Sequence, residues 1–302
     1  MSEEFKTVAV VGRSEDLRVT EPMAILAGYL NEAGVRVITT PDTPAELPAE
    51  QVDEDAIGSE ADLIIAVGGD GTMLHAASLS RDSGVPLLGV NRGRLGFLAD
   101  ITPDEMLASV GQVLAGNYSC ESRLMLNATL ISADRQERSV SGLNDVVVQR
   151  IGTGRMLDIR TRIGHRFVNT HSGDGLIIAT PTGSTAYALS CGGPIIQPGM
   201  NAVVIVPICP HTLSDRPLVV PADKEIEIRL LARIDTQAEV MADSHSLGEL
   251  TPDDRLIVTR SDTRINLVHP PGYDYYEILR TKLHWGRDNR IRDIEADRNQ
   301  GP

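Results

Sequence analysis

The stretch from Ala61 to Leu74, ADLIIAVGGDGTML, constrains the fold of this chain more than any other. Leu63 to Val67 is an unbroken apolar run, which is typical of a strand buried on both faces of a parallel sheet. Gly68 and Gly69 end the run, and the apolar spacing after them predicts the start of a helix. The stretch therefore predicts a strand, a tight turn and a helix, which is the repeating unit of an α/β fold.

The turn in this stretch, from Gly68 to Thr72, has the composition of a phosphate-binding turn. Glycine lets backbone N–H groups come close to a ligand, and the N-terminal amides of the following helix attract anions. The carboxylate of Asp70 would be repelled by phosphate unless the carboxylate holds a metal ion or accepts a proton. We therefore expect Asp70 to be catalytic. A purely structural turn has similar composition, but ligands of open α/β sheets bind at the carboxyl ends of strands, where this turn lies. The predicted phosphate turn consists of Gly68, Gly69, Gly71 and Thr72.

Other nucleotide-binding and hydrolytic motifs do not fit the sequence. The dinucleotide fingerprint GxGxxG fails because Leu74 occupies the place of its third glycine. A GxxxxGK[ST] loop is excluded because the only lysines are Lys6, Lys224 and Lys282, and none follows a glycine-rich turn. Neither a GxSxG elbow nor an HExxH metal pair occurs, which leaves little support for a hydrolase.

The composition suits two cored domains that bind neither nucleic acid nor membrane. Of the 302 residues 41% are hydrophobic, and the net charge of −14 argues against a nucleic-acid partner. No apolar run approaches the ~20 residues that span a bilayer, and the acidic start MSEEFK is unlike a signal peptide. Three scattered cysteines argue against a disulfide framework or a cysteine metal site, so we expect a cytoplasmic setting and no metal ligands. A small anionic ligand remains compatible, because backbone amides and a divalent cation can reverse the local field.

Two patterns of apolar spacing divide the chain into domains. Strand-like and helix-like segments alternate in residues 1–122, which predicts an α/β domain with a Rossmann-like parallel sheet. Short, closely spaced apolar runs fill residues 123–272, which predicts an all-β sandwich domain. Within it we expect separate strands at 256–258 and 265–268. In residues 273–302 we expect a helix from Tyr275 to Leu283 that packs back on one of the domains, and then a mobile tail.

Two segments of the β region carry more polar groups than ordinary turns need. Asn144 and Asp145 begin a strand, and an adjacent amide and carboxylate can hold a purine edge or a ribose diol. An Asx-turn that leads into the strand is the alternative. Residues 172–190 place hydroxyls, glycines and Tyr187 at a strand-to-helix transition, where donors suit a dinucleotide and the tyrosine can stack on a ring. A helix capped by serine or threonine is the alternative there.

Three sequence features together resemble the ATP-dependent NAD kinases of bacteria. They are GGDGT at 68–72, the Asn-Asp pair at 144–145, and GDGLIIATPTGSTAYALS at 173–190. Supporting fragments are NRGRLGFL at 91–98 and CPHTLSDRPL at 209–218. The GGDG turn alone is weak, because phosphofructokinases and diacylglycerol-type lipid kinases have similar turns, whereas TPTGSTAY is specific.

The resemblance implies a phosphotransferase that acts on ATP and NAD. Such kinases join an α/β domain to a β-sandwich. They transfer the γ-phosphoryl group of ATP to the 2′-hydroxyl of the adenosine ribose of NAD, which makes NADP. Mg²⁺ or another divalent cation accompanies the ATP. The resemblance also implies a homotetramer or homodimer in which a neighbouring subunit completes the NAD site.

The resemblance also assigns roles to individual residues. Asp70 is implied to be the general base or a metal-side carboxylate at the ribose hydroxyl, and Gly71 to approach the same ribose. The other positions implied to bind the dinucleotide are Asn144, Asp145, Arg155, Asp174, Thr185, Ala186, Tyr187, Ala188, Leu189, Ser190 and His245. His245 stands where relatives often have glutamine, which adds the capacity for a pH-dependent charge. Ser172 stands where some bacterial relatives carry arginine, so the preference between NAD and NADH stays open.

Two other functions are compatible with parts of the sequence. A GGDG-type lipid or sugar kinase shares the turn, but a lipid kinase needs an exposed apolar or basic face for the membrane. This chain is acidic and poor in lysine and aromatic residues. A non-catalytic dinucleotide-sensing protein is the second alternative, and the presence of Asp70 argues against it. An assay for NADP formation distinguishes a kinase from a sensor.

Overall fold

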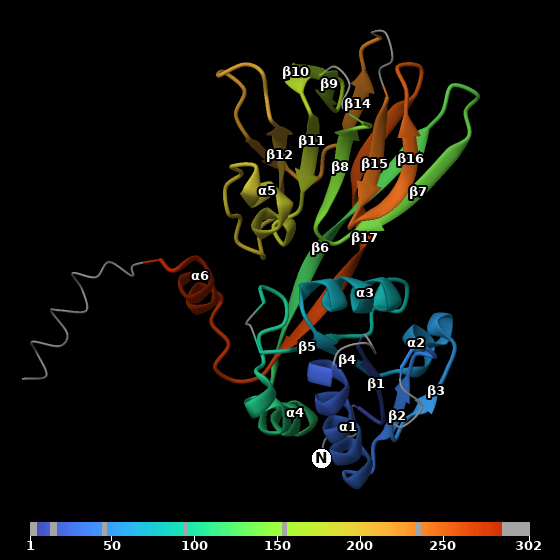
Figure 1. Ribbon diagram of the computed structural model, residues 1–302, viewed down its shortest axis with the longest axis vertical. Helices are drawn as coiled ribbons and strands as arrows, with labels where there is room; N and C mark the ends of the chain where they lie inside the picture. Colours follow the sequence, from blue (N-terminus) through green and yellow to red (C-terminus); the bar gives the residue numbers. More distant parts are fainter. Residues whose placement is uncertain are drawn as a thin grey trace, which may run out of the picture. The chain divides into compact units, whose positions relative to one another are not determined.

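The computed structural model describes residues 5–12, 17–43, 47–93, 96–152, 156–232 and 237–285 (Figure 1). The chain divides into two units, each with its own hydrophobic core. The α/β unit comprises residues 1–79, 87–119 and 268–302, and the β unit comprises residues 80–86 and 120–267. The mobile tail predicted after the C-terminal helix lies outside the described residues.

The sheet of the α/β unit consists of parallel strands. In spatial order they are β5 (Leu87–Asn91), β4 (Leu63–Gly68), β1 (Thr7–Val11), β2 (Arg36–Thr39) and β3 (Glu50–Gln51). β4 lies between β5 and β1, and all of its residues are buried, as the apolar run predicts for a strand covered on both faces. Its last residue, Gly68, pairs with Asn91 at the end of β5. The carboxyl ends of these two strands therefore meet at one edge of the sheet.

Two helices pack together on one face of this sheet. Side chains of α1 (Leu17–Glu32) and α4 (Met106–Leu114) share a core cluster with Val8 and Val10 of β1. The helices approach closely, because a Cβ at Gly111 of α4 would stand 2.8 Å from the hydroxyl of Tyr29 in α1. The short 3₁₀ turn η1 (Pro103–Glu105) leads into α4. This layer forms the larger core of the unit.

The helix after β4 covers the opposite face. α3 (Asp70–Ser80) brings Met73 close to β5, where its sulfur would stand 2.9 Å from a Cβ at Gly89. Gly89 lies between two residues that point toward α1 and α4, and neighbouring strand residues face opposite sides. α2 (Glu54–Glu60) and α6 (Tyr275–Leu283) complete the described α-helices of the α/β unit, and the helix predicted at 275–283 is confirmed.

The β unit is a sandwich of two antiparallel sheets. One sheet contains, in spatial order, β13 (Leu218–Pro221), β12 (Ala202–Ile208), β11 (Gly175–Ala179), β8 (Asp145–Arg150), β15 (Ala238–Ala242) and β16 (His245–Leu250). In the other, β10 (Arg166–Gly173), β9 (Leu157–Ile163), β14 (Ile226–Leu230) and β17 (Arg255–His269) are neighbours, and β6 (Ser119–Ile131) pairs with β17 and with β7 (Glu137–Gly142). Apolar side chains of both sheets meet in one core cluster. The predicted combination of an α/β domain with a β-sandwich is confirmed.

A second apolar cluster covers the outer face of the sheet that contains β8 and β11. Ala188 and Ile196, from the segment after β11, pack there on Val147 and Ile177. Because neighbouring strand residues point to opposite faces, this cluster is separate from the core between the sheets. Residues 180–196 are thereby held against β8 and β11.

The prediction of two strands at 256–258 and 265–268 is wrong. Both runs belong to the single strand β17, whose middle residues 259–264 alternate between half-buried and exposed. No apolar side chain marks these residues, so the pattern that identifies a half-buried strand is missing there. Strands β7 and β16, which are largely exposed, escape recognition for the same reason.

Candidate active site

Asp70 is the first residue of α3, directly after β4 and Gly69. The N–H groups of Thr72 and Met73 donate to the Gly69 carbonyl oxygen at 2.9 and 3.2 Å, which closes the first helical turn. Amides in the first turn of an α-helix lack partners within the helix and suit an anion. Asp70 therefore stands at the positive end of α3, whereas the sequence predicts it in a turn before the helix.

Two backbone amides hold the Asp70 carboxylate. The Leu98 N–H donates to Oδ1 at 3.0 Å, and the Phe97 N–H donates to Oδ2 at 3.1 Å. Gly96 makes this approach possible, because a Cβ at that position would overlap Asp70 Oδ1. Each carboxylate oxygen has two lone pairs, so each keeps one for a substrate hydroxyl or a cation. The two bonds fix the direction of the carboxylate and leave acceptors for a ligand.

The positions of the predicted phosphate turn are glycine for different structural reasons. A Cβ at Gly68 would overlap Thr72 Oγ1, so this glycine lets α3 pack closely on the end of β4. A Cβ at Gly69 or Gly71 would meet no other atom within 4 Å. Packing therefore gives no reason for glycine at these two positions. Close approach of a ligand to the backbone is the reason that remains.

In the β unit, Asn144 and Asp145 lie at the start of β8 and are held by Asp243. Oδ1 of Asp243 accepts the N–H of Asn144 at 2.8 Å and the N–H of Asp145 at 3.3 Å, and Oδ2 accepts the N–H of Leu143 at 2.5 Å. Asp243 and Ser244 connect β15 to β16, and both have positive φ, as in a type I′ hairpin turn. One half-buried carboxylate thus fixes three consecutive amides at the start of the strand.

The hydroxyl-rich segment docks on the same backbone. The Thr180 N–H donates to the Asn144 carbonyl oxygen at 2.9 Å, and Thr180 Oγ1 donates to the Leu143 carbonyl oxygen at 2.6 Å. A Cβ at Gly183 would overlap the Asn144 carbonyl, so a larger residue does not fit there. The structure therefore brings the pair at 144–145 together with the segment 180–190.

Most of the predicted dinucleotide-binding residues lie on two short helical turns, η2 (Gly183–Thr185) and α5 (Tyr187–Ser190). Tyr187 and Ser190 are exposed, and Thr185, Ala186 and Leu189 are half-buried. The side chain of Ala188 is fully buried in the outer cluster, so only its backbone is available to a ligand. Burial raises the pKa of Tyr187, and the Cys191 thiol and the Asp145 charge add to the shift. Tyr187 is therefore a neutral hydrogen-bond donor at physiological pH.

Burial raises the pKa of Asp145 to about 7, and repulsion by the Asp243 carboxylate contributes. At neutral pH a substantial fraction of Asp145 therefore carries a proton. A protonated carboxyl group both donates and accepts hydrogen bonds, whereas an ionised one only accepts. Burial also raises the pKa of Asp243, although the amides of residues 143–145 oppose that shift. Asp145 can consequently bind a donor or an acceptor on a ligand.

Of the remaining predicted residues, one lies at the far end of β11 from this cluster. Asp174 precedes β11, at the opposite end of that strand from Thr180, and its Oδ1 accepts from Nε of Arg150 at 2.9 Å. At about 3.4 Å per residue, the length of β11 separates these ends by roughly 17 Å. His245 is exposed at the start of β16. Arg155 lies outside the described residues.

Sequence reasoning did not assign Asp243, Phe97 or Leu98 to the site. The signal for Phe97 and Leu98 is the glycine-rich connection at 91–98. These residues act through backbone amides, which do not depend on residue type, so the sequence does not mark them. For Asp243, the signal is an acidic residue in a two-residue connection between strands, a position that favours Asn, Asp or Gly.

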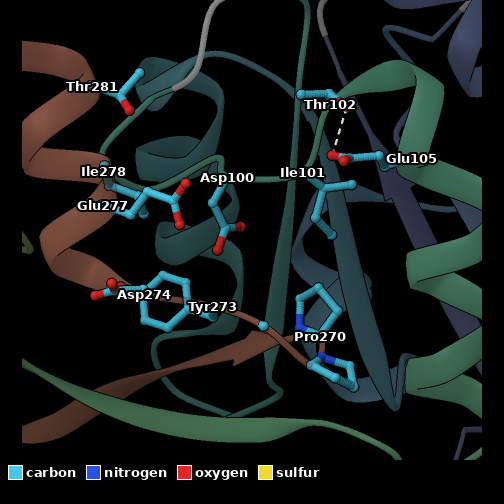
Figure 2. A pocket seen from close by; sticks show the side chains of 12 residues that line it. Asp100, Ile101, Thr102, Glu105, Pro270, Tyr273, Asp274, Glu277, Ile278 and Thr281 are labelled. Atoms are coloured by element: carbon cyan, nitrogen blue, oxygen red, sulfur yellow. Dashed lines mark hydrogen bonds between the residues drawn. The ribbon is translucent and has the colours of Figure 1, made fainter. Parts of the chain in front are cut away.

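A cavity of about 320 Å³ lies in the α/β unit (Figure 2). It is lined by residues 100–102, 105 and 270–274 and by one side of α6 (Glu277, Ile278 and Thr281), and by none of the predicted site residues. Among its lining residues the Thr102 hydroxyl donates to Glu105 Oε2 at 2.7 Å (Figure 2). The Asp100 carboxylate pairs with Nδ1 of His269 at 2.9 Å. We therefore locate the candidate site by the chemistry of its residues and not by this cavity.

Within the described ranges, no helix has the length and apolar character needed to cross a bilayer. The same ranges contain no group of three or more His, Cys, Asp or Glu side chains that could hold a metal ion.

Known family models match both units of the chain. The ATP-NAD kinase N-terminal domain matches residues 3–118, and the ATP-NAD kinase C-terminal domain matches residues 143–270. This chain belongs to the ATP-NAD kinase family. The N-terminal match contains the Asp70 turn, and the C-terminal match contains the pair at 144–145 and the segment 180–190.

Curated relatives in the ATP-NAD kinase family match over nearly their whole length. The NAD kinase of Bordetella parapertussis is 43% identical over 286 residues, which cover 93% of this chain and 96% of that protein. The NAD kinase of Nitrosococcus oceani is 41% identical over 290 residues, which cover 95% of this chain and 99% of that protein.

Solved structures of ATP-NAD kinases have the same fold. Yeast NADH kinase complexed with NADH has a TM-score of 0.87 and 25% identity, and the match covers 95% of this chain and 89% of that one. The NAD kinase of Archaeoglobus fulgidus in complex with ATP has a TM-score of 0.68 and 26% identity, and the match covers 86% of this chain and 92% of that one.

Proposed function

We propose that this protein is an ATP-dependent NAD kinase, which phosphorylates the 2′-hydroxyl of the adenosine ribose of NAD and releases NADP and ADP. Membership of the ATP-NAD kinase family supports the activity. The observation that carries the chemistry is the Asp70 carboxylate, fixed by two amides at the start of α3. A lipid or sugar kinase would share only the GGDG turn, whereas the family match extends over both units.

We assign Asp70 the role of general base. During transfer, the 2′-oxygen forms a bond to the γ-phosphorus while the bond between that phosphorus and the β–γ bridging oxygen breaks. The hydroxyl proton passes to a free lone pair of the Asp70 carboxylate. Phosphoryl transfer depends mainly on position and charge neutralisation. The carboxylate held by Phe97 and Leu98 supplies the position, and the N-terminal amides of α3 offset negative charge on the phosphates.

The Asp70 carboxylate at the start of α3 fits a divalent cation that arrives with ATP. The described residues contain no three-ligand cluster, and Mg²⁺ is commonly held by one or two carboxylates, substrate phosphates and water. Asp70 is the residue that would hold it, through a lone pair that the amides leave free. When bound, Mg²⁺ neutralises charge on the phosphates.

We further propose that the adenosine of NAD binds at Asn144 and Asp145. The amide of Asn144 and the partly protonated carboxyl of Asp145 together offer donors and acceptors for an adenine edge and a ribose diol. The segment Thr185–Ser190 would line the dinucleotide, with Tyr187 and Ser190 as the exposed side chains. Arg155, Asp174 and His245 are proposed as further contacts.

The separation of Asp174 from Asn144 along β11 supports a homo-oligomer, a tetramer or a dimer, in which Asp174 serves a neighbouring subunit's site. Light scattering after size-exclusion chromatography tests the oligomer, and a monomer that retains full activity would contradict it.

The proposed cytoplasmic location is supported by Cys120, Cys191 and Cys209, which are all free thiols.

A coupled assay tests the proposed function. Purified protein is incubated with NAD, ATP and Mg²⁺, and an NADP-specific dehydrogenase reports the product. We expect NADP formation that requires both ATP and a divalent cation. NAD binding by calorimetry without NADP formation would instead indicate a sensing protein. The same assay with polyphosphate as donor and NADH as acceptor defines the substrate range, including the effect of Ser172.

A further inference from the structure

We infer that Asp243 is a positioning residue for NAD, acting through Asn144 and Asp145. The inference rests on the proposed binding of NAD at these two residues. Asp243 accepts the N–H groups of residues 143, 144 and 145, which are the amides of the chain as it enters β8. The orientation of both proposed NAD contacts is therefore set by one carboxylate on a different hairpin.

The Asp243 carboxylate uses both of its oxygens to bind this stretch of backbone. Both oxygens of Asp243 accept backbone amides, and its own N–H donates to the Asp145 carbonyl oxygen at 3.2 Å. The residue also has φ +45°, a conformation that side chains other than those of Asn and Asp rarely adopt. The β15–β16 connection thus holds this carboxylate against the start of β8.

Asp243 also governs the electrostatics of Asp145. Its charge is the one that contributes, after burial, to the raised pKa of Asp145. The other titratable groups that face this pair are Tyr187, from α5, and His245, from β16. Tyr187 stays neutral in the working range, and His245 faces Asp243 rather than Asp145. A change at residue 243 therefore alters both the position and the protonation of the NAD contact.

The substitution Asp243→Asn tests this role. Asparagine tolerates positive φ and keeps one acceptor, but its NH₂ group cannot accept the third amide, and the negative charge is lost. We expect the KM for NAD to rise about 10- to 100-fold, as for loss of a hydrogen bond to a charged group. We expect the KM for ATP and kcat to stay within about threefold. The titration of Asp145 in the pH profile of kcat/KM for NAD should move to lower pH, which a loss of folding alone would not cause.

Two further variants complete the design. Asp253→Asn changes an exposed acid in the loop between β16 and β17, and should leave all these parameters unchanged. Asp243→Glu keeps the charge but displaces it, so the KM for NAD should rise while the pH profile stays near that of the wild type. Because glutamate is strained at this positive φ, circular dichroism and thermal unfolding first establish that Asp243→Glu folds. A folded Asp243→Glu with a wild-type KM for NAD would refute the positioning role even if Asp243→Asn does not fold.

The outcomes separate the inference from the proposed function. Asn144→Ala should raise the KM for NAD and leave ATP binding nearly unchanged. If it does and Asp243→Asn changes neither the KM for NAD nor the pH profile, the positioning role is refuted and the proposed NAD site stands. If Asn144→Ala has no effect on NAD, both the site and the positioning role are refuted. Failure of the wild type to form NADP would refute the proposed function itself.

Discussion

The carbonyl group of Asn144 occupies the space that a side chain at Gly183 would need. The contact joins the two segments of the β unit that the sequence singles out, one before β8 and one after β11. Since Thr180 donates to the same carbonyl oxygen, the two segments form one rigid surface. This surface is what we propose NAD binds.

We predict that Gly183→Ala separates these segments. The added methyl group overlaps backbone, which cannot move aside as a flexible side chain can, so we expect a loss of about 1–3 kcal/mol in the free energy of unfolding. The KM for NAD should rise about tenfold or more, because the contact groups shift. Gly199→Ala, where a Cβ meets nothing within 4 Å, is the matched control. Equal effects of the two substitutions on NADP formation would contradict the prediction.

A second glycine substitution addresses the α/β unit. In Gly96→Ala the new methyl group overlaps Asp70 Oδ1, so the carboxylate must turn away from the Phe97 and Leu98 amides. We expect kcat to fall about 10- to 100-fold, as for a small misplacement of a catalytic group. Gly28→Ala, in α1 with open space around the new methyl group, should leave kcat unchanged and raise stability by about 0.5–1 kcal/mol. Steady-state kinetics on both variants check this, and an unchanged kcat in Gly96→Ala would contradict it.

The buried Asp145 predicts a specific dependence of stability on pH. Its pKa is about 7 in the folded protein, against a usual value of 3.8. Between these values the folded state binds more protons than the unfolded state, so the free energy of unfolding falls as pH rises from about 4 to about 7. Above that range both states are ionised, and the effect is complete.

The substitution Asp145→Asn removes this dependence. Urea unfolding at pH 5 and pH 8 should show that the wild type loses ~2 kcal/mol more than Asp145→Asn over this interval. Asp253→Asn serves as the control, and should lose as much as the wild type. The same pH dependence in the wild type and in Asp145→Asn would show that Asp145 is not the group responsible.

Local patterns in the sequence predicted the parts of the fold that are buried on regular faces. The apolar run of β4 and the helical spacing of α6 are examples, and the structure has both elements where they were expected. The middle of β17 could not be predicted, because its residues are all polar and show no apolar alternation, although one face of the strand is half-buried. A strand is recognisable in a sequence when one of its faces is buried and therefore apolar, and this segment has no such face.

The candidate site was likewise only partly predictable from the sequence. Asp70 and the pair at 144–145 are recognisable because residue type matters at those positions. The partners that fix them could not be found from the sequence, since Phe97 and Leu98 contribute only backbone amides, 27 and 28 residues beyond Asp70. Asp243 lies about a hundred residues from the amides it holds, and only the pairing of β15 with β8 brings it there.

The substitution Asp70→Asn tests the proposed catalytic role most directly, with Asp62→Asn as its matched control. Asp62 also accepts two backbone amides, from Lys6 and Thr7, but lies at the start of β4, at the opposite end of that strand from Asp70. If Asp70 is the general base, kcat for NADP formation falls by about two to four powers of ten in Asp70→Asn. The control should retain wild-type turnover. A wild-type kcat in Asp70→Asn, with only the KM for substrate changed, would contradict the proposed mechanism.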